Sequence, residues 1–218
     1  MLDKIKNRIC VLCGHYGSGK TNVAVNLAKA AARAGKRVCI VDFDVVNPYF
    51  RTADNRAELT ELGVRCIIPQ YANTNVDIPS IPAEFQSVFI SDEFCIIDVG
   101  GDDGAIALSA YKERFEECGY DMVYVYNKSR PLISEEDDAA ESVRYIEATS
   151  GMRISWLVNN TNLGEETTAR TVEEGEDACL ALSERVGVPF LATTAFKEVK
   201  GITREGVFYM DNATKRLF

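Results

Sequence analysis

The chain has a single histidine, no pair of C-x-x-C motifs and no excess of positive charge. One histidine and unpaired cysteine motifs argue against a zinc site of the usual spacing. No apolar run reaches about 18 residues, the length that a membrane-spanning helix needs. The net charge of −9 disfavours a large DNA-binding face, which requires clustered lysine and arginine. We therefore expect neither nucleic-acid nor membrane binding.

The cysteines predict a cellular setting rather than a reaction. The first residues lack the apolar stretch of a secretory signal, so seven cysteines indicate a reducing, cytoplasmic environment. Cys10 and Cys13 form a C-x-x-C, but residues i and i+3 of a strand face opposite sides of a sheet. Cys39 and Cys95 also fall in apolar runs. We interpret all four as small core residues.

Residues 14–21 read Gly-His-Tyr-Gly-Ser-Gly-Lys-Thr and fit G-x-x-x-x-G-K-[ST], the phosphate-binding P-loop. Its glycines permit backbone angles and a close approach that a Cβ atom would block. The loop amides then form an anion-binding nest at the positive end of the following helix. Lys20 would reach the phosphates, and the Thr21 hydroxyl would ligate Mg²⁺. The predicted nucleotide-binding residues of this segment are Gly14, His15, Tyr16, Gly17, Ser18, Gly19, Lys20, Thr21 and Asn22.

The flanks of this motif meet its requirement for a strand before it and a helix after it. Residues 9–13, Ile-Cys-Val-Leu-Cys, suit a buried parallel strand. Residues 22–34 are rich in alanine with apolar residues at helical spacing, and this pattern stops at Gly35. The context therefore favours a true P-loop over a glycine-rich turn with an incidental lysine.

Strand-like and helix-like segments alternate along the whole chain. This alternation predicts an α/β fold in which three α/β/α layers surround a mostly parallel sheet. We expect one domain over residues 1–218, with an irregular insertion at 69–92, either a lid or a surface loop, and a C-terminal tail at 201–218. Ser134 is the expected cap of the helix that follows it. The expected strands are 8–13, 37–42, 64–68, 94–98, 121–126, 153–158 and 189–193, and the clearest helices are 20–34, 104–118, 134–150 and 166–187.

Two of the predicted strands end in aspartates. The second strand runs into Asp42 and Asp44, and the fourth ends at Asp98. Because the carboxyl ends of parallel strands line the ligand crevice, we expect these side chains beside the phosphates. Asp98 would hold Mg²⁺ together with Thr21, Asp42 would support the metal shell, and Asp44 would orient the attacking water. The candidate catalytic residues are thus Lys20, Asp42 and Asp44.

These pieces, in this order, resemble the MinD/ParA class of P-loop ATPases, which includes nitrogenase iron protein and metal-cluster assembly ATPases. The resemblance covers residues 8 to 200, with Val-Asp-Phe-Asp at 41–44 similar to switch I and Asp-Val-Gly-Gly at 98–101 similar to switch II. It implies ATP and Mg²⁺ as cofactors, a central P-loop strand, and a switch driven by hydrolysis. It also implies that a strand-end asparagine contacts adenine, with Asn159 as the first choice and Asn160 as the second.

Two positions depart from known nucleotide-binding patterns. The class carries a signature lysine that crosses to the nucleotide of a partner subunit, and here His15 stands in its place. Imidazole is shorter and carries less charge at neutral pH, which puts the homodimer implied by the class in doubt. Residues 127–130 resemble the guanine-reading N-K-x-D, but Arg130 replaces the carboxylate, so ATP is favoured over GTP. Lys128 and Arg130 either approach the nucleotide or form an exposed pair.

The resulting expectation is an ATP-hydrolysing switch that acts on a protein client in cofactor maturation or positioning. Tyr49 and Phe50 are either a partner contact that moves with the nucleotide or packing beneath a loop. One alternative is a small-molecule enzyme of the dethiobiotin-synthetase or cobyrinate-amidating type, which needs a pocket beside the γ-phosphate. Another is a nucleotide-binding module with little turnover. The tail has only Lys215 and Arg216 as local cations, which favours ordinary packing over a MinD-like membrane anchor.

Overall fold

The chain forms a continuous eight-stranded sheet. The computed structural model describes residues 1–43, 55–68 and 83–213, and for positions 102 and 103 it describes the backbone alone. The strands are β1 (Ile9–Cys13), β2 (Val38–Phe43), β3 (Arg65–Ile67), β4 (Phe94–Val99), β5 (Asp121–Tyr126), β6 (Trp156–Asn159), β7 (Phe190–Phe196) and β8 (Phe208–Met210). Their order is β3-β2-β4-β1-β5-β6-β7-β8, and every neighbouring pair is parallel. The P-loop strand β1 therefore lies near the centre of the sheet, as the resemblance implies.

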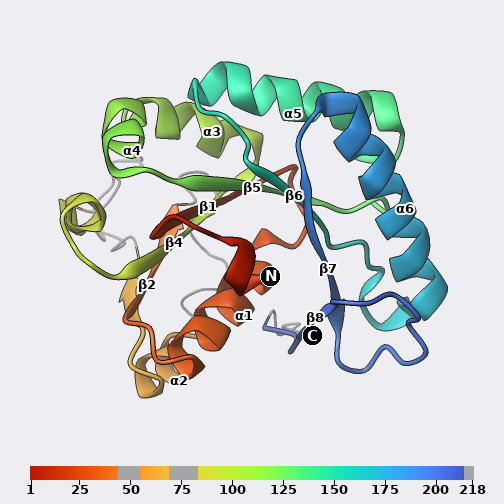
Figure 1. The fold of residues 1–218 in the computed structure, drawn as a ribbon, viewed down its shortest axis with the longest axis horizontal. Coiled ribbons are helices and arrows are strands. Elements are labelled where there is room, and N and C mark those ends of the chain that lie inside the picture. Colours follow the sequence, from red (N-terminus) through yellow and green to blue (C-terminus); the bar gives the residue numbers. More distant parts are fainter. Residues whose placement is uncertain (44–54, 69–82, 214–218) are drawn as a thin grey trace, which may run out of the picture.

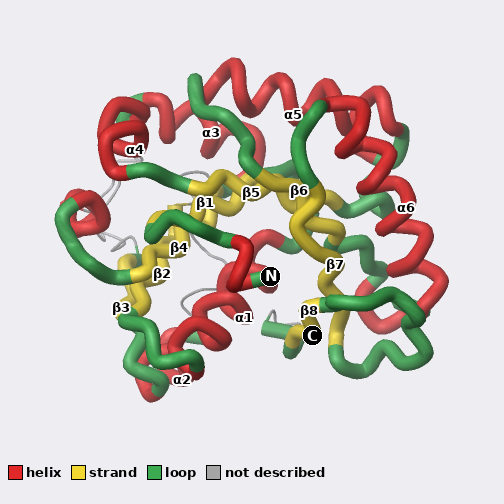
Figure 2. Tube along the Cα trace, in the orientation of Figure 1, coloured by secondary structure: helices red, strands yellow, loops and turns green. Residues whose placement is uncertain are grey.

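Helices cover both faces of this sheet. The helices are α1 (Lys20–Arg33), α2 (Arg56–Glu61), α3 (Gly101–Ser109), α4 (Lys112–Cys118), α5 (Glu136–Ser150) and α6 (Ala169–Val186), with short 3₁₀ turns η1 (Leu2–Lys4), η2 (Ala83–Phe89), η3 (Pro131–Ile133) and η4 (Gly164–Glu166). Figure 1 shows α1 and α2 on one side of the sheet and α3 to α6 on the other, and Figure 2 shows the strands as a band between them. The predicted three-layer α/β/α fold is confirmed.

Each face of the sheet has its own apolar core, because side chains alternate along every strand. Cys10 packs with Val23 and Leu27 of α1 in one core. Cys13 packs in the other, which also contains Phe115 and Leu182. The C-x-x-C pair is thus divided between the two faces, and the prediction that these cysteines are core residues is confirmed.

The single helix expected over 104–118 is two helices. The first, α3, already begins at Gly101, and the second, α4, begins after Tyr111. The Tyr111 ring packs edge-on against Phe85, with the centroids 4.9 Å apart, and also contacts Phe43. This aromatic packing lies at the break, and spacing along the sequence alone gave no sign of it.

The cap expected for α5 was also wrong. The N-cap is Glu135, and it makes no side-chain capping bond. The Ser134 hydroxyl instead donates to the Pro131 carbonyl at 3.1 Å, because the preceding residues form the turn η3. A true capping box occurs at α6, where the Thr168 side chain accepts a hydrogen bond from the Thr171 amide.

The described part of the C-terminal tail packs against the fold. Strand β8 extends the sheet beside β7 and was not predicted. Beyond it, the Asp211 amide donates to Asn26 of α1 at 2.9 Å, and the Ala213 amide donates to Asn22 at 2.8 Å. In the described ranges no helix has both the length and the apolar character needed to cross a membrane. The described ranges exclude Tyr49 and Phe50, residues 69–82 of the expected insertion, and residues 214–218.

Candidate nucleotide-binding site

The loop between β1 and α1 requires glycine at the positions that the motif fixes. Gly14 has φ of +137° and Gly19 has φ of +89°, backbone conformations that L-residues with a side chain rarely adopt. A Cβ atom on Gly14 would lie 2.6 Å from the backbone oxygen of Val125 on the neighbouring strand. A Cβ atom on Gly19 would lie 2.3 Å from the side-chain nitrogen of Asn160. The loop is therefore pressed against β5 and the end of β6, and only glycine fits.

Lys20 begins α1 and folds back over the loop that precedes it. Its side chain is buried, and its ammonium group donates to the carbonyls of Gly14 at 2.8 Å and His15 at 3.0 Å. The Ser18 amide donates to the His15 carbonyl at 3.1 Å, which closes the turn. The Ser18 hydroxyl is fully buried and has no hydrogen-bond partner within the described ranges. An orphaned buried donor in a glycine cradle fits a site for an oxyanion.

The predicted carboxylates meet at the N-terminus of α1. The Thr21 hydroxyl donates to Oδ2 of Asp98 at 2.7 Å. Asp42 on β2 and Asp98 on β4 are partners in the strand register, and both are buried. Two adjacent buried carboxylates repel each other, and a divalent cation relieves that repulsion. This set of hard oxygen donors fits Mg²⁺. Asp44 lies outside the described residues.

Three asparagines of the predicted site lie in different surroundings. Asn159 is fully buried, and its amide donates to the Val172 carbonyl at 3.0 Å and to the Thr193 hydroxyl at 3.2 Å. Asn160 donates to the backbone oxygen of Ser18 at 2.7 Å, so it contacts the P-loop directly. The side chain of Asn22 accepts from the tail amide described above. Both candidates at the end of β6 are buried, and Asn160 is the one that hydrogen-bonds to the P-loop.

Arg130 lies on the P-loop, a position that the sequence left open. Its Nε atom is 3.5 Å from where a Cβ on Gly17 would stand, and its Cζ is 3.7 Å from the same point. That Nε is buried and has no hydrogen-bond partner among the residues described. The turn that carries Arg130 is fixed by Asn127, whose carbonyl accepts from the Arg130 amide at 3.1 Å. In the sequence, the incomplete N-K-x-D pattern at residues 127–130 was the signal that pointed to this turn.

A cavity opens beside the second residue of the P-loop. Its volume is about 370 Å³, and it lies between the loop, the turn η3 and the first turns of α5. Asp138 and Glu141 give it an acidic side, and Leu132 and Tyr145 give it apolar parts. The complete lining is His15, Leu132, Ile133, Asp138, Glu141, Ser142 and Tyr145. Tyr16, also in the loop, is exposed.

The order of the sheet, the glycine cradle, and the contact between Thr21 and Asp98 together define a P-loop nucleotide-binding protein of the three-layer α/β/α class. Comparison with known families agrees. The chain matches the profile of the CobQ/CobB/MinD/ParA nucleotide binding domain over residues 9–194 and belongs to that family.

Curated relatives match only a short segment. Over 48 residues the chain is 46% identical to the cytosolic Fe-S cluster assembly factor Nubp2 homolog of Drosophila persimilis, a segment covering 22% of this chain and 19% of that protein. It is 45% identical over 47 residues to the iron-sulfur cluster carrier protein of Methanocaldococcus jannaschii, which covers 22% of this chain and 16% of the relative. The matched segment therefore spans less than a fifth of the length of these relatives.

Solved structures share the fold at low identity. The cell division protein FtsY of Thermotoga maritima aligns with a TM-score of 0.55 and 15% identity, covering 88% of this chain and 63% of its own. The signal recognition particle receptor FtsY of Elizabethkingia anophelis aligns with a TM-score of 0.53 and 18% identity, covering 85% of this chain and 57% of its own. These similarities support the fold alone.

Proposed function

We propose that the protein is a cytoplasmic, Mg²⁺-dependent ATPase that acts as a nucleotide-controlled switch on a protein client. The observation that carries this proposal is the Thr21–Asp98 hydrogen bond at the start of α1, with Asp42 beside Asp98 in the strand register. A phosphate cradle alone would serve many ligands. A cradle joined to a hydroxyl and two buried carboxylates is the arrangement that nucleotide–Mg²⁺ chemistry uses.

Each residue of the site has its own proposed role in binding ATP and Mg²⁺. Lys20 and the loop amides bind the phosphates of ATP and compensate their charge. Thr21, Asp98 and Asp42 would hold Mg²⁺, which when bound neutralises charge on the phosphate oxygens. Asp44 would orient the attacking water. Asn160 donates to the Ser18 carbonyl of the P-loop, whereas Asn159 donates to Val172 and Thr193, so we assign Asn160 as the amide beside the base.

The client is proposed to belong to metal-cofactor maturation. Two relatives that match this chain carry names of iron–sulfur cluster assembly or transfer. Control of a client requires that the protein surface change shape with the bound nucleotide. The resemblance of residues 41–44 and 98–101 to switch segments supports such a change.

The binding preference tests the first step of this function. Titration calorimetry of the purified chain with ATP and with GTP, each with Mg²⁺ and with a chelator, measures four affinities. We expect tighter binding of ATP than of GTP and a loss of ATP affinity when the chelator removes Mg²⁺. Equal affinities for the two nucleotides would contradict the assignment of ATP, and unchanged binding in chelator would contradict the role of Thr21, Asp42 and Asp98.

Arg130 is proposed to contact the phosphates of bound ATP and to supply a cation at the P-loop. A hydrogen bond to a charged group contributes about 1.5–3 kcal/mol, so Arg130→Ala should lower ATP turnover by about 10- to 100-fold. Exposed Lys128, two residues earlier on the same turn, is the matched control, and Lys128→Ala should leave turnover within about two-fold. Phosphate release at ATP concentrations well below KM, where the rate reports kcat/KM, checks both variants. Equal rates for Arg130→Ala and wild type would remove Arg130 from the site.

The cavity beside His15 favours a second candidate function, a small-molecule ATP-dependent enzyme. Such an enzyme needs a substrate pocket next to the transferred phosphate, and this cavity adjoins the P-loop. Its carboxylates, Asp138 and Glu141, would suit a substrate that carries an amine. A cationic metabolite that raises phosphate release in wild type, but not in the Asp138→Asn, Glu141→Gln double variant, would favour this function over the protein client.

A further inference from the structure

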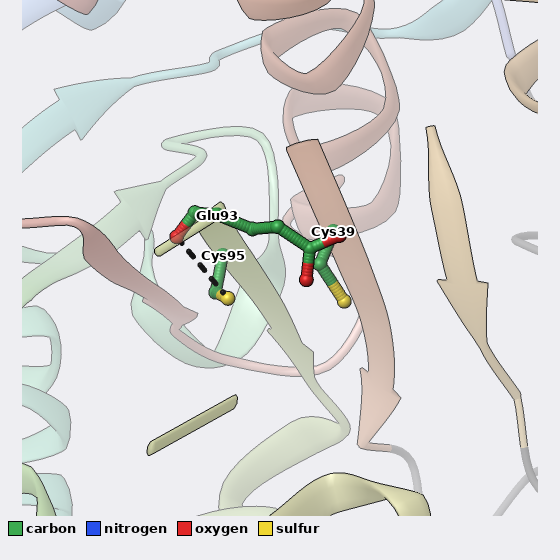
Figure 3. Close-up of side chains that lie close together, drawn as sticks. All are labelled: Cys39, Glu93 and Cys95. Carbon is green, nitrogen blue, oxygen red and sulfur yellow. Dashed lines mark hydrogen bonds between the residues drawn. The ribbon is translucent and has the colours of Figure 1, made fainter. Parts of the chain in front are cut away.

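Two thiols and a carboxylate lie together at the amino ends of β2 and β4, away from the P-loop. Cys39 and Cys95 are partners in the strand register, so their side chains leave the same face of the sheet. A carboxylate oxygen of Glu93 joins them, and the three donor atoms lie within 4.8 Å of one another. Figure 3 shows the Glu93 side chain extending toward Cys39 and the hydrogen bond, 3.5 Å long, from the Cys95 thiol to the Glu93 carbonyl.

Neighbouring residues hold the carboxylate of this cluster in place. Arg65 on β3 is the strand partner of Cys39 and lies in the same row across the sheet. Its Nε donates to both oxygens of Glu93, at 3.2 and 3.1 Å, and its Nη1 donates to the hydroxyl of Ser87 at 3.0 Å. Ligating carboxylates in metal sites are oriented by such partners. The Glu93 side chain is 12% exposed, so its carboxylate reaches the edge of the solvent, whereas both thiols are buried.

We propose that Cys39, Cys95 and Glu93 bind one thiophilic divalent cation, with zinc(II) as the best fit. Binding would replace the two thiol protons, which leave to solvent. Two thiolates and one carboxylate carry three negative charges, and Arg65 and the divalent ion carry three positive charges. The buried cluster is then neutral, as burial requires. The donor set of sulfur and carboxylate oxygen suits zinc, with water in the fourth position.

The geometry needs only a small contraction. Zinc–sulfur bonds of about 2.3 Å at tetrahedral angles place two sulfur atoms about 3.8 Å apart. The donor atoms here lie within 4.8 Å of one another, so they need to approach by at most about 1 Å. Rotation of the Cys39, Cys95 and Glu93 side chains can supply such a shift without a change in the register of β2 and β4.

Cys10 is a buried cysteine that lies outside the cluster of Cys39, Cys95 and Glu93. It lies on β1 in the opposite apolar core, and burial raises the pKa of its thiol. The described structure places no comparable cluster of donors around it. Cys10 is therefore the matched control for a cysteine whose role is packing alone.

Cobalt(II) is a direct probe, because thiolate ligands give it a charge-transfer band in the near ultraviolet. We would titrate the reduced full chain with cobalt(II) and then displace it with zinc(II). We expect one equivalent of cobalt to produce the band, and one equivalent of zinc to remove it. The Cys39→Ser, Cys95→Ser double variant should lose the band, while Cys10→Ser should keep it. Arg65→Gln should weaken metal binding by about 10- to 100-fold through loss of the carboxylate's support.

The absence of a band in the wild type would overturn the site, as would a band that survives in the double variant. Far-ultraviolet circular dichroism of each variant, measured separately, shows whether the chain is folded. Because the cluster is remote from the P-loop, the metal result does not depend on whether the protein hydrolyses ATP. A double variant that fails to fold would be replaced by Glu93→Gln, for which we expect weaker metal binding and unchanged ATP binding.

Discussion

Replacing Lys20 with alanine is expected to lower ATP turnover by about 10²–10³-fold, the cost of removing one preorganised donor to developing charge. The buried ammonium group of Lys20 is held over the loop by the carbonyls of Gly14 and His15, which fixes its position before a ligand binds. Alanine removes the positive charge and the two hydrogen bonds that the ammonium group donates to the loop. Phosphate release under saturating ATP gives the rate, and titration calorimetry gives the accompanying loss of ATP affinity.

A surface lysine serves as the control for this substitution. Lys112 on α4 is partly exposed and pairs with Glu116 one helical turn away. Such pairs contribute less than about 1 kcal/mol, so Lys112→Ala should leave turnover and affinity unchanged. Chemical denaturation of both variants separates a loss of function from a loss of fold. Wild-type affinity in a folded Lys20→Ala variant would mean that the loop does not bind phosphate in the way we propose.

The substitution Gly14→Ala is expected to disrupt the site through the backbone. Alanine at φ of +137° is strained, and its Cβ would lie 2.6 Å from the Val125 backbone oxygen. Because a strand at the centre of the sheet cannot move aside, the loop would have to leave its conformation. We expect a loss of about 2–4 kcal/mol in the free energy of unfolding and at least about a 100-fold loss of ATP affinity.

Gly35 provides the matched control, since it isolates backbone strain from the clash. It follows α1 with φ of +82°, and a Cβ there would meet nothing within 4 Å. Gly35→Ala should cost about 1 kcal/mol of stability from strain and leave ATP affinity unchanged. Urea unfolding and calorimetry compare the two variants. Equal stability losses in Gly14→Ala and Gly35→Ala would show that the contact with β5 does not constrain the loop.

Much of the fold and the core of the site could be predicted because their signals are local. The P-loop is eight consecutive residues with a strand before it and a helix after it. Asp42 and Asp98 end apolar strands, and the rule that parallel strands share one carboxyl edge places them together. The register of β2 and β4 makes them direct partners, which agrees with that prediction.

The remaining features depend on contacts between distant segments. Arg130 lies on the loop only because β5 is the neighbour of β1, which no spacing in the sequence shows. Asn159 and Asn160 are adjacent in sequence and both buried, yet Asn159 donates to Val172 and Thr193 whereas Asn160 donates to the P-loop carbonyl of Ser18. The strand β8 has three residues, too few for a periodic pattern. Cys39 and Cys95 are 56 positions apart, and only the pairing of β2 with β4 brings them together.

Release of inorganic phosphate from Mg-ATP by the purified chain tests the central claim most directly. The measurement compares wild type with Lys20→Ala, each with Mg²⁺ and with a chelator, alone and with a candidate client. We expect release by wild type in Mg²⁺, slow alone and faster with the client, and background release in the chelator and in the Lys20→Ala variant. Equal rates in wild type and Lys20→Ala under every condition would contradict the assignment of this protein as an ATPase.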